Sequence, residues 1–479
     1  MLKLLITTTF FIYFCKCGDA PPNIAFCSTT TTNIRNAPCG TVIDSASPGQ
    51  CFRTLEGRQV CSLSGASYNF WELENSGSPG WIASEYLDPA DGYDKAAGRV
   101  PGESIEPPAE FRGAFIATVS NIDWPSSCNP SGITEHQAQM TAYLDALQDA
   151  NMNAILLQVR TSGDAFYNSL IEPWSRYLTC TQGSSPSPPW DPLEWIIGEA
   201  HSKGIEVHAW LNPYRANLSP SFSGLASNHP CLSNLASSCH IYDKYLWMDP
   251  GAPEVVDHLI NVISDILQRY EVDGIHFDDY FYPYPSSEEF PDDSTYAQYG
   301  DGMARDDWRR DNVNKMVARV SQTVKALKPD AKFSISPFGI YRPGHPEGMP
   351  SPIVGFDPYS GIYADAKAWL LDGLVDFIAP QLYWGINPAS QSYNLLFDWW
   401  TSSVANPLGI PVMGATGLYK VPDQGWPAEE IYMQVDVTRG YAQRNGAGNV
   451  HYSAKFIRDN TNGITTQLKA IYKNPVPPY

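Results

Sequence analysis

Short apolar runs alternate with helix-like patterns along most of the chain, from residue 111 toward the C-terminus. Runs of this length, bounded by turn residues, are typical of strands buried in a parallel sheet. We expect strands at residues 113–119, 154–159, 206–211, 274–277, 332–336, 377–381, 411–415 and 449–453. Eight strands that alternate with helices predict an α/β fold, the (β/α)8 TIM barrel, over residues 111–473.

Three of the intervening segments carry apolar residues at helical spacing. Thr134 and Gln137 predict a capping box at the start of a helix over residues 134–150. Two further amphipathic helices are expected at 253–270 and 305–328. The second of these has aspartates at its start and lysines at its end, which is the arrangement that the helix dipole favours.

The N-terminal part of the chain follows a different pattern. Residues 23–88 contain short extended pieces separated by Gly, Pro and Ser, without a helical period, and this predicts a small all-β barrel. Prolines among charges and glycines mark residues 89–110 as an extended linker.

Residues 1–17 have the pattern of a secretory signal peptide, with a lysine, an apolar run and small residues. We favour cleavage after Cys17 over cleavage after Ala20, because Pro21 would follow the second site. A lipoprotein anchor at Cys17 is disfavoured because no lipobox precedes it. No later segment is apolar enough to span a membrane, so the sequence predicts a secreted protein.

Charge and cysteine content narrow the choice of partners. The chain has 31 Lys and Arg against 51 Asp and Glu, which argues against nucleic acid and anionic lipid because phosphate binding depends on basic residues. Eight of its ten cysteines follow the signal peptide, and an even number in an oxidising compartment predicts disulfides. No Cys or His spacing indicates zinc, and we expect no metal and no cofactor. Pairing is expected within three groups, namely Cys27, Cys39, Cys51 and Cys61; Cys128 and Cys180; and Cys231 and Cys239.

Two adjacent carboxylates, Asp278 and Asp279, directly follow the strand expected at 274–277. Neighbouring carboxylates repel, so one of them holds its proton to higher pH. A proton donor beside a carboxylate is what cleavage of a glycosidic bond requires. Their place after a barrel strand favours catalysis; the alternative is a structural ion-pair network with Arg160 or Arg215.

Polar and aromatic residues follow the other expected strands as well. Planar donors suit sugar hydroxyls, and aromatic rings suit the faces of sugars. We expect the substrate to be bound by Gln158, Arg160, Asp164, Asn212, Tyr214, Arg215, Tyr280, Gln381, Tyr383 and Trp384.

Several residues also have structural interpretations. Asp164 follows a glycine and could serve only to order its loop, and Tyr383 and Trp384 could pack in the core. Asp273 stands at the start of its strand, far from the catalytic end, and is expected to be structural. For His276 we leave two roles open, a hydrogen-bonded core histidine or a residue of the site.

Six ordered motifs connect the chain to a known family. They are V-R-x-x-G-D-A-x-Y (159–167), E-P-W-S-x-x-L-T (172–179), W-x-N-P-Y-R (210–215), D-P-G-x-P-E-V (249–255), D-G-I-H-F-D-D-Y-x-Y-P (273–283) and A-P-Q-x-Y-W (379–384). Over residues 110–472 the chain resembles the family-ten-like glycosyl hydrolases, secreted bacterial proteins that include an enzyme cutting denuded glycan strands of peptidoglycan. The resemblance implies a TIM barrel and glycosidase activity.

The N-terminal segment has a resemblance of its own. It starts with N-x-R-x-x-P (33–38) and ends with a Gly-Trp pair at 80–81. In this order of motifs, residues 23–88 resemble the bacterial-type SH3 domain, a family that commonly targets cell walls.

The sequence around the aspartate pair is similar to the chitinase signature D-G-x-D-x-D-x-E, with Tyr280 at the position of the acid. The seventh strand ends without a carboxylate that could act as nucleophile. Adjacent aspartates also occur in hexosaminidases that use the acetamide of the substrate as the nucleophile. On that resemblance, Asp278 orients the acetamide and Asp279 protonates the leaving oxygen.

The predicted function is therefore that of a secreted glycosidase acting on an N-acetylated polysaccharide, first of all the glycan strands of peptidoglycan. One alternative is a non-catalytic lectin that binds cell wall or chitin, which the tyrosine at 280 motivates. Another is an enzyme for a different polysaccharide, such as an α-linked glucan or a galactosaminan. Asn217 is a glycosylation sequon if the host secretes through an endoplasmic reticulum.

Overall fold

A computed structural model describes residues 107–386 and 390–477 in full and, before residue 107, the backbone of seven strands. The chain divides into two units, Met1–Ser104 and Ile105–Tyr479. The predicted signal peptide, most of the predicted linker and the side chains of the first four mature cysteines lie outside the described residues.

The described strands of the N-terminal unit form one seven-stranded antiparallel sheet in the order β3-β2-β6-β5-β4-β1-β7. An all-β unit was expected at 23–88; its assignment to the SH3 family stays a prediction. The strands are β1 (Ala25–Ser28), β2 (Thr32–Arg35), β3 (Val42–Ala46), β4 (Cys51–Leu63), β5 (Ala66–Leu73), β6 (Gly80–Ala83) and β7 (Leu87–Pro89).

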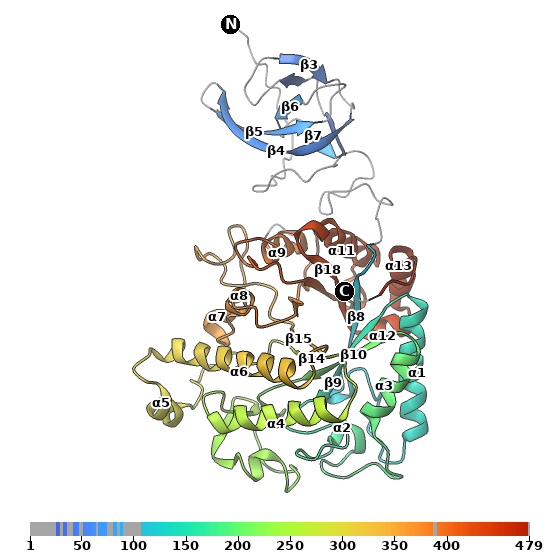
Figure 1. The fold of residues 1–479 in the computed structure, drawn as a ribbon, viewed down its shortest axis with the longest axis vertical. Helices are drawn as coiled ribbons and strands as arrows, with labels where there is room; N and C mark the ends of the chain where they lie inside the picture. Colours follow the sequence, from blue (N-terminus) through green and yellow to red (C-terminus); the bar gives the residue numbers. More distant parts are fainter. Residues whose placement is uncertain are drawn as a thin grey trace. The chain divides into compact units, whose positions relative to one another are not determined.

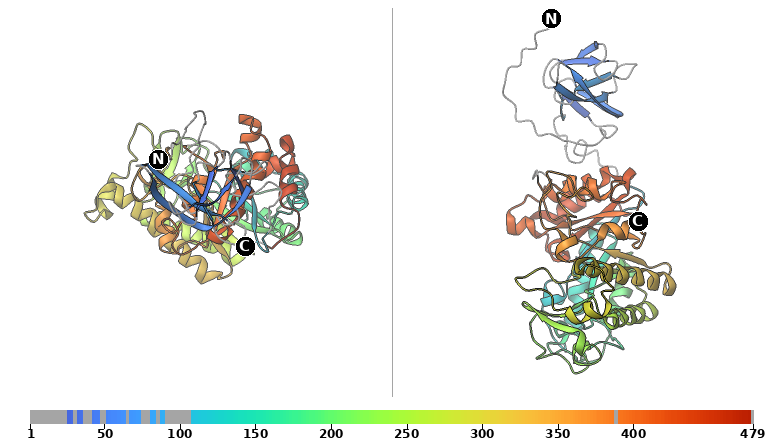
Figure 2. Two further views of the ribbon diagram at one scale, coloured as in Figure 1. Left: turned by 90° about the horizontal axis from the view of Figure 1, so that it is seen from above. Right: turned by 90° about the vertical axis from the view of Figure 1, so that its left-hand side faces the viewer.

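The second unit is a closed barrel of eight parallel strands, as the alternation of apolar runs predicts (Figures 1 and 2). Around the barrel the order is β10-β14-β15-β16-β17-β18-β8-β9. The strands are β8 (Phe111–Ile116), β9 (Ala154–Arg160), β10 (Glu206–Leu211), β14 (Gly274–Phe277), β15 (Lys332–Ile335), β16 (Phe377–Ile378), β17 (Val412–Gly417) and β18 (Gly446–Tyr452).

Four strands end earlier than expected, β15 and β18 by one residue and β8 and β16 by three. The strand predicted at 113–119 ends at Ile116, because the amide of Ala117 donates to the carboxylate of Asp123 (2.7 Å) instead of to a neighbouring strand. The strand predicted at 377–381 ends at Ile378, close to Pro380, which has no N–H to give to a sheet. Both β8 and β16 therefore end close to a residue that cannot continue the backbone hydrogen bonds of the sheet.

Helices cover the outside of the barrel (Figure 1). The amphipathic helices expected at 253–270 and 305–328 are present as α4 and α6. The capping box predicted at Thr134 is wrong, since α1 begins one residue earlier, after Gly132, without a side-chain cap. The helices are α1 (Ile133–Asp149), α2 (Arg176–Thr179), α3 (Pro192–Ser202), α4 (Pro253–Arg269), α5 (Asp293–Tyr299), α6 (Arg305–Leu327), α7 (Pro358–Gly361), α8 (Ala366–Leu371), α9 (Tyr393–Trp400), α10 (Lys420–Gln424), α11 (Glu429–Gly440), α12 (Ala454–Arg458) and α13 (Ile464–Ile471).

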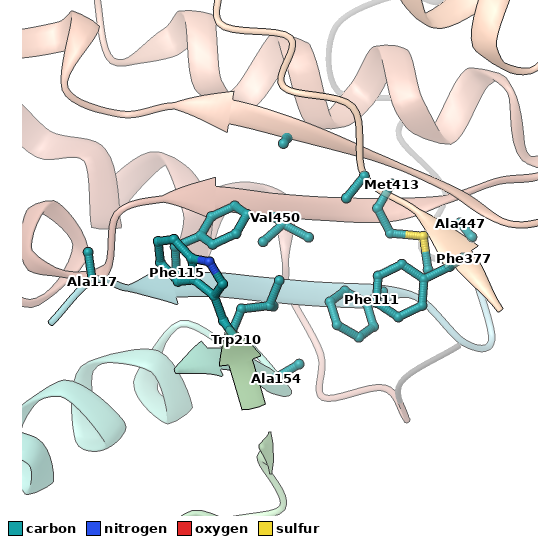
Figure 3. Close-up of a cluster of buried hydrophobic side chains, with 12 residues drawn as sticks. Phe111, Phe115, Ala117, Ala154, Trp210, Phe377, Met413, Ala447 and Val450 are labelled. Atoms are coloured by element: carbon teal, nitrogen blue, oxygen red, sulfur yellow. The ribbon is translucent and has the colours of Figure 1, made fainter. Parts of the chain in front are cut away.

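Large and small apolar side chains fill the interior of the barrel (Figure 3). Phe111 contacts Phe377 across it, with ring centroids 4.9 Å apart, and Phe115 contacts Trp210 at 5.5 Å. His276 lies in this interior, where its Nδ1 pairs with the Ser334 hydroxyl (2.8 Å) and burial holds its pKa well below the usual value. The structure therefore favours the core role for His276.

Long loops extend from the C-terminal ends of the strands. One of them carries a three-stranded antiparallel sheet of β11 (Arg215–Asn217), β13 (Tyr245–Met248) and β12 (Cys239–Tyr242). The disulfides Cys128–Cys180 and Cys231–Cys239 are formed, as predicted. Among the described residues, no helix combines the length and apolar character needed to cross a membrane.

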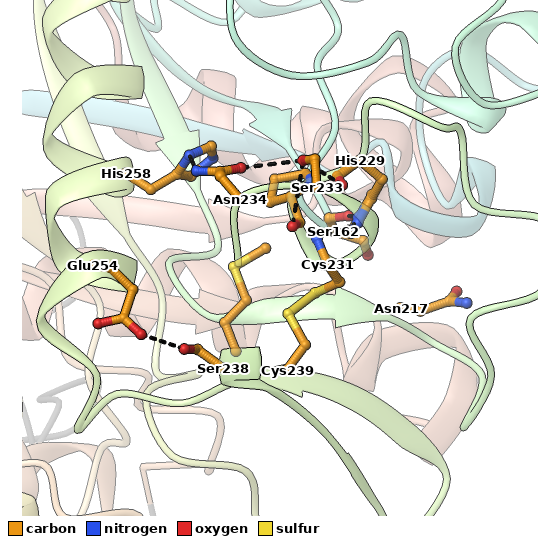
Figure 4. The surroundings of a disulfide bond; sticks show 12 residues. Ser162, Asn217, His229, Cys231, Ser233, Asn234, Ser238, Cys239, Glu254 and His258 are labelled. Carbon is orange, nitrogen blue, oxygen red and sulfur yellow. Dashed lines mark hydrogen bonds between the residues drawn. A yellow bond between two sulfur atoms is a disulfide. The ribbon is translucent and has the colours of Figure 1, made fainter. Parts of the chain in front are cut away.

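Figure 4 shows the surroundings of the second disulfide, among them Asn217, the asparagine of the predicted glycosylation sequon. Ser238, beside the disulfide, hydrogen-bonds to Glu254 at the start of α4, which anchors the loop to the barrel. Asn217 is buried and donates from Nδ2 to the carbonyl of Ser221 (2.9 Å). Its amide is thus occupied inside the fold, so the glycosylation sequon is not accessible.

Candidate active site

Asp278 and Asp279 lie where β14 ends, at the C-terminal end of the barrel. The strand stops at Phe277, and the amide of Tyr280 then donates to Oδ1 of Asp278 (3.1 Å). The amide of Phe281 donates to the carbonyl of Asp279 (3.1 Å), which turns the chain. This bend lets consecutive residues, which would point to opposite faces of a regular strand, both take buried positions, with exposed fractions of 4% and 5%.

The two carboxylates accept hydrogen bonds from different neighbours. Oδ2 of Asp278 accepts hydrogen bonds from Trp210 Nε1 (3.2 Å) and Asn212 Nδ2 (2.5 Å), at the end of β10. Asp279 turns the other way, toward β16, where Gln381 Nε2 donates to its Oδ1 (2.7 Å). The hydroxyl of Tyr284 donates to the Oδ2 of Asp279. Both side chains are therefore held by neutral donors.

Burial and mutual repulsion set the charge of the pair. Burial first, and the neighbouring Asp279 second, raise the pKa of Asp278 to about 7. Burial also raises the pKa of Asp279, against the lowering effect of the hydrogen bonds from Tyr284 and Gln381. Adjacent carboxylates titrate as a unit, and this unit retains a proton near neutral pH. One proton donor and one carboxylate are thus available together.

Asn212 connects the pair to a buried hydrogen-bond network. Its Oδ1 accepts from Gln158 Nε2 and from Arg215 Nη2, both at 2.7 Å. Oε1 of Gln158 accepts in turn from the amides of Thr118 and Val119, each at 2.9 Å. Gln158, which the sequence predicts as a substrate ligand, is therefore buried and hydrogen-bonded on both sides of its amide to the protein, where it supports Asn212.

Arg160 is also committed to protein partners. It forms a buried ion pair with Glu172, with Nη2 2.6 Å from Oε1, and donates from Nη1 to the carbonyl of Asn212 (2.5 Å). Neither Arg160 nor Arg215 forms an ion pair with Asp278 or Asp279 among the described residues, so the structural ion-pair alternative for the aspartates is wrong.

Two further predicted ligands lie away from the pair. Asp164 accepts hydrogen bonds from the Thr161 hydroxyl (2.7 Å), the Ser162 amide (3.1 Å) and Gln182 (3.3 Å), so it orders its loop. Tyr214 is fully buried, and its hydroxyl has no hydrogen-bond partner among the described residues. Neither side chain is open to a substrate in this structure, and a role of either one as a ligand stays a prediction.

Aromatic rings border the pair where the barrel meets solvent. Tyr280, Tyr383 and Trp384, all predicted from the sequence, are partly exposed. Tyr280 contacts Tyr284 with ring centroids 5.7 Å apart, and Tyr383 contacts Tyr452 at 6.0 Å. Rings that are held by other rings yet reached by solvent can stack on sugar faces.

Sequence reasoning missed Trp210 and Tyr284 as partners of the aspartates. Trp210 could have been found, because it lies on β10 two residues before Asn212, which directly follows the strand, and side chains two residues apart in an extended chain point to the same face. Tyr284 comes from the loop after β14, and no period predicts that its hydroxyl returns to Asp279.

Asp273, which was expected to be structural, has protein partners at the start of its strand. Asp273 accepts hydrogen bonds from the Val207 amide (2.7 Å) and lies 2.8 Å from His201 Nε2, at the start of β14. Among the described residues, no group of three or more His, Cys, Asp or Glu side chains is placed to hold a metal ion.

Comparison with known proteins identifies the family of the chain. The model of the family Glycosyl hydrolase-like 10 matches residues 110–433. The glycosyl hydrolase YngK of Bacillus subtilis (strain 168) is 38% identical over 377 residues, which cover 76% of this chain and 72% of the relative. The glycosyl hydrolase DigH of Escherichia coli (strain K12) is 35% identical over 342 residues, covering 68% and 77%.

Solved structures give weaker likenesses. The glycoside hydrolase domain of PgaB (BpsB) from Bordetella bronchiseptica has a TM-score of 0.48 and 13% identity, covering 76% of this chain and 99% of that domain. An endo-1,4-beta-mannanase from Rhizomucor miehei has a TM-score of 0.46 at 13% identity, covering 77% and 97%. On the family model and the two relatives, the chain belongs to the Glycosyl hydrolase-like 10 family and is a glycosidase.

Proposed function

We propose that this glycosidase is secreted and cleaves O-glycosidic bonds in an N-acetylated polysaccharide, first of all the glycan strands of peptidoglycan. The observation that carries the proposal is the pair Asp278 and Asp279, buried together, jointly retaining a proton and held by neutral donors. The signal peptide predicted at 1–17 and the SH3-like unit predicted at 23–88 support a substrate outside the cell. Glycosidase activity overturns the lectin alternative.

The acceptor sites of Asp278 suit it to orienting an acetamide. Its Oδ2 already accepts two hydrogen bonds, whereas its Oδ1 accepts only the Tyr280 amide. A carboxylate oxygen can accept two, so Oδ1 has one place left for the acetamide N–H. With that hydrogen bond made, the acetamide oxygen is directed at the anomeric carbon.

Asp279 is then the proton donor. As the acetamide oxygen bonds to the anomeric carbon and the glycosidic C–O bond breaks, Asp279 gives its proton to the leaving oxygen. Water next adds to the anomeric carbon of the cyclic intermediate, Asp279 takes a proton from that water, and the acetamide is released. The sugar keeps its anomeric configuration and the carboxyl returns to its starting state.

A carboxylate nucleophile from the protein finds no support among the described residues. A retaining glycosidase of the common type needs one about 5 Å from the acid. Asp123, Asp164 and Glu172 follow barrel strands, but each is occupied by protein donors. This leaves the acetamide of the substrate as the nucleophile.

The test uses the full chain with peptide-free peptidoglycan strands and with chitin oligomers, and counts new reducing ends. We expect Asp279→Asn to lose about 10²–10⁴-fold in kcat on strands, yet to retain much of its activity on 4-nitrophenyl N-acetylglucosaminide, whose leaving group needs no proton. Asp278→Asn should lose activity on both substrates, because the acetamide is no longer oriented.

The surface variant Asp398→Asn is the matched control, because Asp398 forms an ion pair with Arg444 on the surface. It should cleave as the wild type does. Undiminished cleavage of strands by Asp279→Asn would show that the acid is assigned wrongly. Absence of wild-type activity on every acetamido glycan would overturn the proposed substrate class.

A further inference from the structure

Five arginines are buried among the residues that the structure describes, and one of them differs from the rest. Four form ion pairs with a carboxylate within 2.8 Å, namely Arg112 and Arg439 with Glu110, Arg160 with Glu172, and Arg309 with Asp292. Arg215 is equally buried, at 5% exposed, yet forms no ion pair with any described residue.

The Arg215 guanidinium is fixed beside the aspartate pair. Its Nε donates to the carbonyl of Thr161 (3.0 Å), and its Nη2 donates to Oδ1 of Asn212 (2.7 Å), the residue that holds Asp278. The charge lies 5.3 Å from the ring centroid of Tyr280. Nη1 has no hydrogen-bond partner among the described residues, although Arg215 as a whole is only 5% exposed. One N–H group of a fixed cation therefore remains without a protein partner beside the site.

A buried charge without a partner is costly and is normally paired. The aspartate pair balances Arg215 only in part, because the pair shares a proton and makes no contact with the guanidinium within 4 Å. The protein as a whole does not attract anions, because the formal net charge of the full chain is −20. A buried cation such as Arg215 can nevertheless bind an acidic group locally, through charge-assisted hydrogen bonds.

We propose that this N–H group of Arg215 binds a carboxylate carried by a sugar of the substrate, so that the enzyme is selective for acidic over neutral acetamido glycans. This inference rests on the proposed function and narrows its substrate. The same chemistry has two sources in acetamido glycans, a lactyl ether on the sugar ring, as in peptidoglycan, or a uronate at C6. A role for Arg215 in balancing the aspartates alone is the competing explanation.

The experiment compares matched substrates on the full chain. Peptide-free peptidoglycan strands carry free lactyl carboxylates, and the same strands with those groups coupled to methylamine carry neutral amides. Chitin hexamer is a second neutral substrate, and hyaluronan carries the uronate. Charge-assisted hydrogen bonds are strong enough that we expect wild type to prefer free over amidated strands by about 10–100-fold in kcat/KM.

The variants separate the two explanations. Arg215 also supports Asn212 and acts on the charge of the pair, so Arg215→Gln should lower kcat/KM on every substrate. The loss should be larger on free strands than on neutral substrates and so remove the preference, and Arg215→Lys should retain part of it. Activity on neutral 4-nitrophenyl N-acetylglucosaminide shows that the variant site is intact and normalises the comparison. Arg444→Gln, which changes a surface arginine, should leave the preference unchanged. Selective loss on hyaluronan instead of on strands would assign the carboxylate to a uronate.

Equal wild-type cleavage of free and amidated strands would overturn this inference while the proposed function stood. Equal losses of Arg215→Gln on acidic and neutral substrates would overturn it too, since that is the result expected from charge balance alone. Cleavage of no acetamido glycan at all would overturn the proposed function, and this inference with it.

Discussion

Replacing Asp278 by asparagine should stabilise the protein at alkaline pH, because the native carboxylate ionises at a cost. Burial and Asp279 raise its pKa from 3.8 to about 7. A shift of about three units corresponds to about 4 kcal/mol at about 1.4 kcal/mol per unit.

The sign follows from proton binding. The native state holds the Asp278 proton more tightly than the unfolded state does, so the free energy of unfolding falls as pH rises from about 4 to about 7 and then levels off. Asp278→Asn removes this titration. Its amide loses acceptor capacity toward Asn212, a cost that is the same at every pH. The variant should therefore gain about 4 kcal/mol relative to wild type between pH 4 and pH 8.

The assay is urea unfolding of the full chain at pH 4, 6 and 8, followed by tryptophan fluorescence. The control is Asp398→Asn, because Asp398 is partly exposed in a surface ion pair and its difference from wild type should stay within about 1 kcal/mol across the range. If the difference between Asp278→Asn and wild type changes by less than about 1 kcal/mol from pH 4 to pH 8, burial does not raise the pKa of Asp278, and the account of a proton retained by the pair fails.

Three further changes test the surroundings of the pair, and the pH profile tests the pair itself. Initial cleavage rates should fall above pH 7, as the pair loses the proton needed by the leaving oxygen; a flat alkaline limb would contradict this. Tyr284→Phe removes a donor that lowers the pKa of the acid, so the alkaline limb should move to higher pH. Gly339→Ala places a Cβ against the backbone carbonyl of Gln381, and the displacement should lower kcat by about tenfold or more at substrate saturation. Glu172→Ala leaves Arg160 buried without its carboxylate, and urea unfolding should show a loss of about 3–5 kcal/mol.

The barrel could be predicted from the sequence because burial on both faces makes each strand an uninterrupted apolar run. The strands at 206–211 and 274–277 are found where they were expected. The ends of β8 and β16 were not predicted. β8 ends where the carboxylate of Asp123 accepts a hydrogen bond from the amide of Ala117, a contact that no periodic pattern encodes. β16 ends two residues before Pro380, a proline that the apolar pattern did not take into account.

The sequence predicted which polar residues lie at the ends of the barrel strands, but not which partners their side chains have. Asp278, Asp279, Asn212 and Gln381 follow barrel strands and meet as the fold requires. Which of the polar residues stay free for a ligand depends on side-chain partners that no local pattern encodes. Arg160, for example, is taken up by Glu172, which follows it by twelve residues in an irregular loop.

The identity of the donors around the pair explains how a buried acid keeps its proton. Trp210, Asn212, Gln381 and Tyr284 are neutral, so they orient the carboxylates without the strong stabilisation of the ionised form that a contacting cation would bring. Two cations lie close to the pair: Arg215, which donates to Oδ1 of Asn212, and Arg160, which reaches the carbonyl of Asn212. Arg160 has a carboxylate partner. Its ion pair with Glu172, whose pKa is held at about 2, neutralises that charge at all working pH values. The cation that does act on the aspartates is Arg215, which lowers the pKa of both, and burial outweighs it.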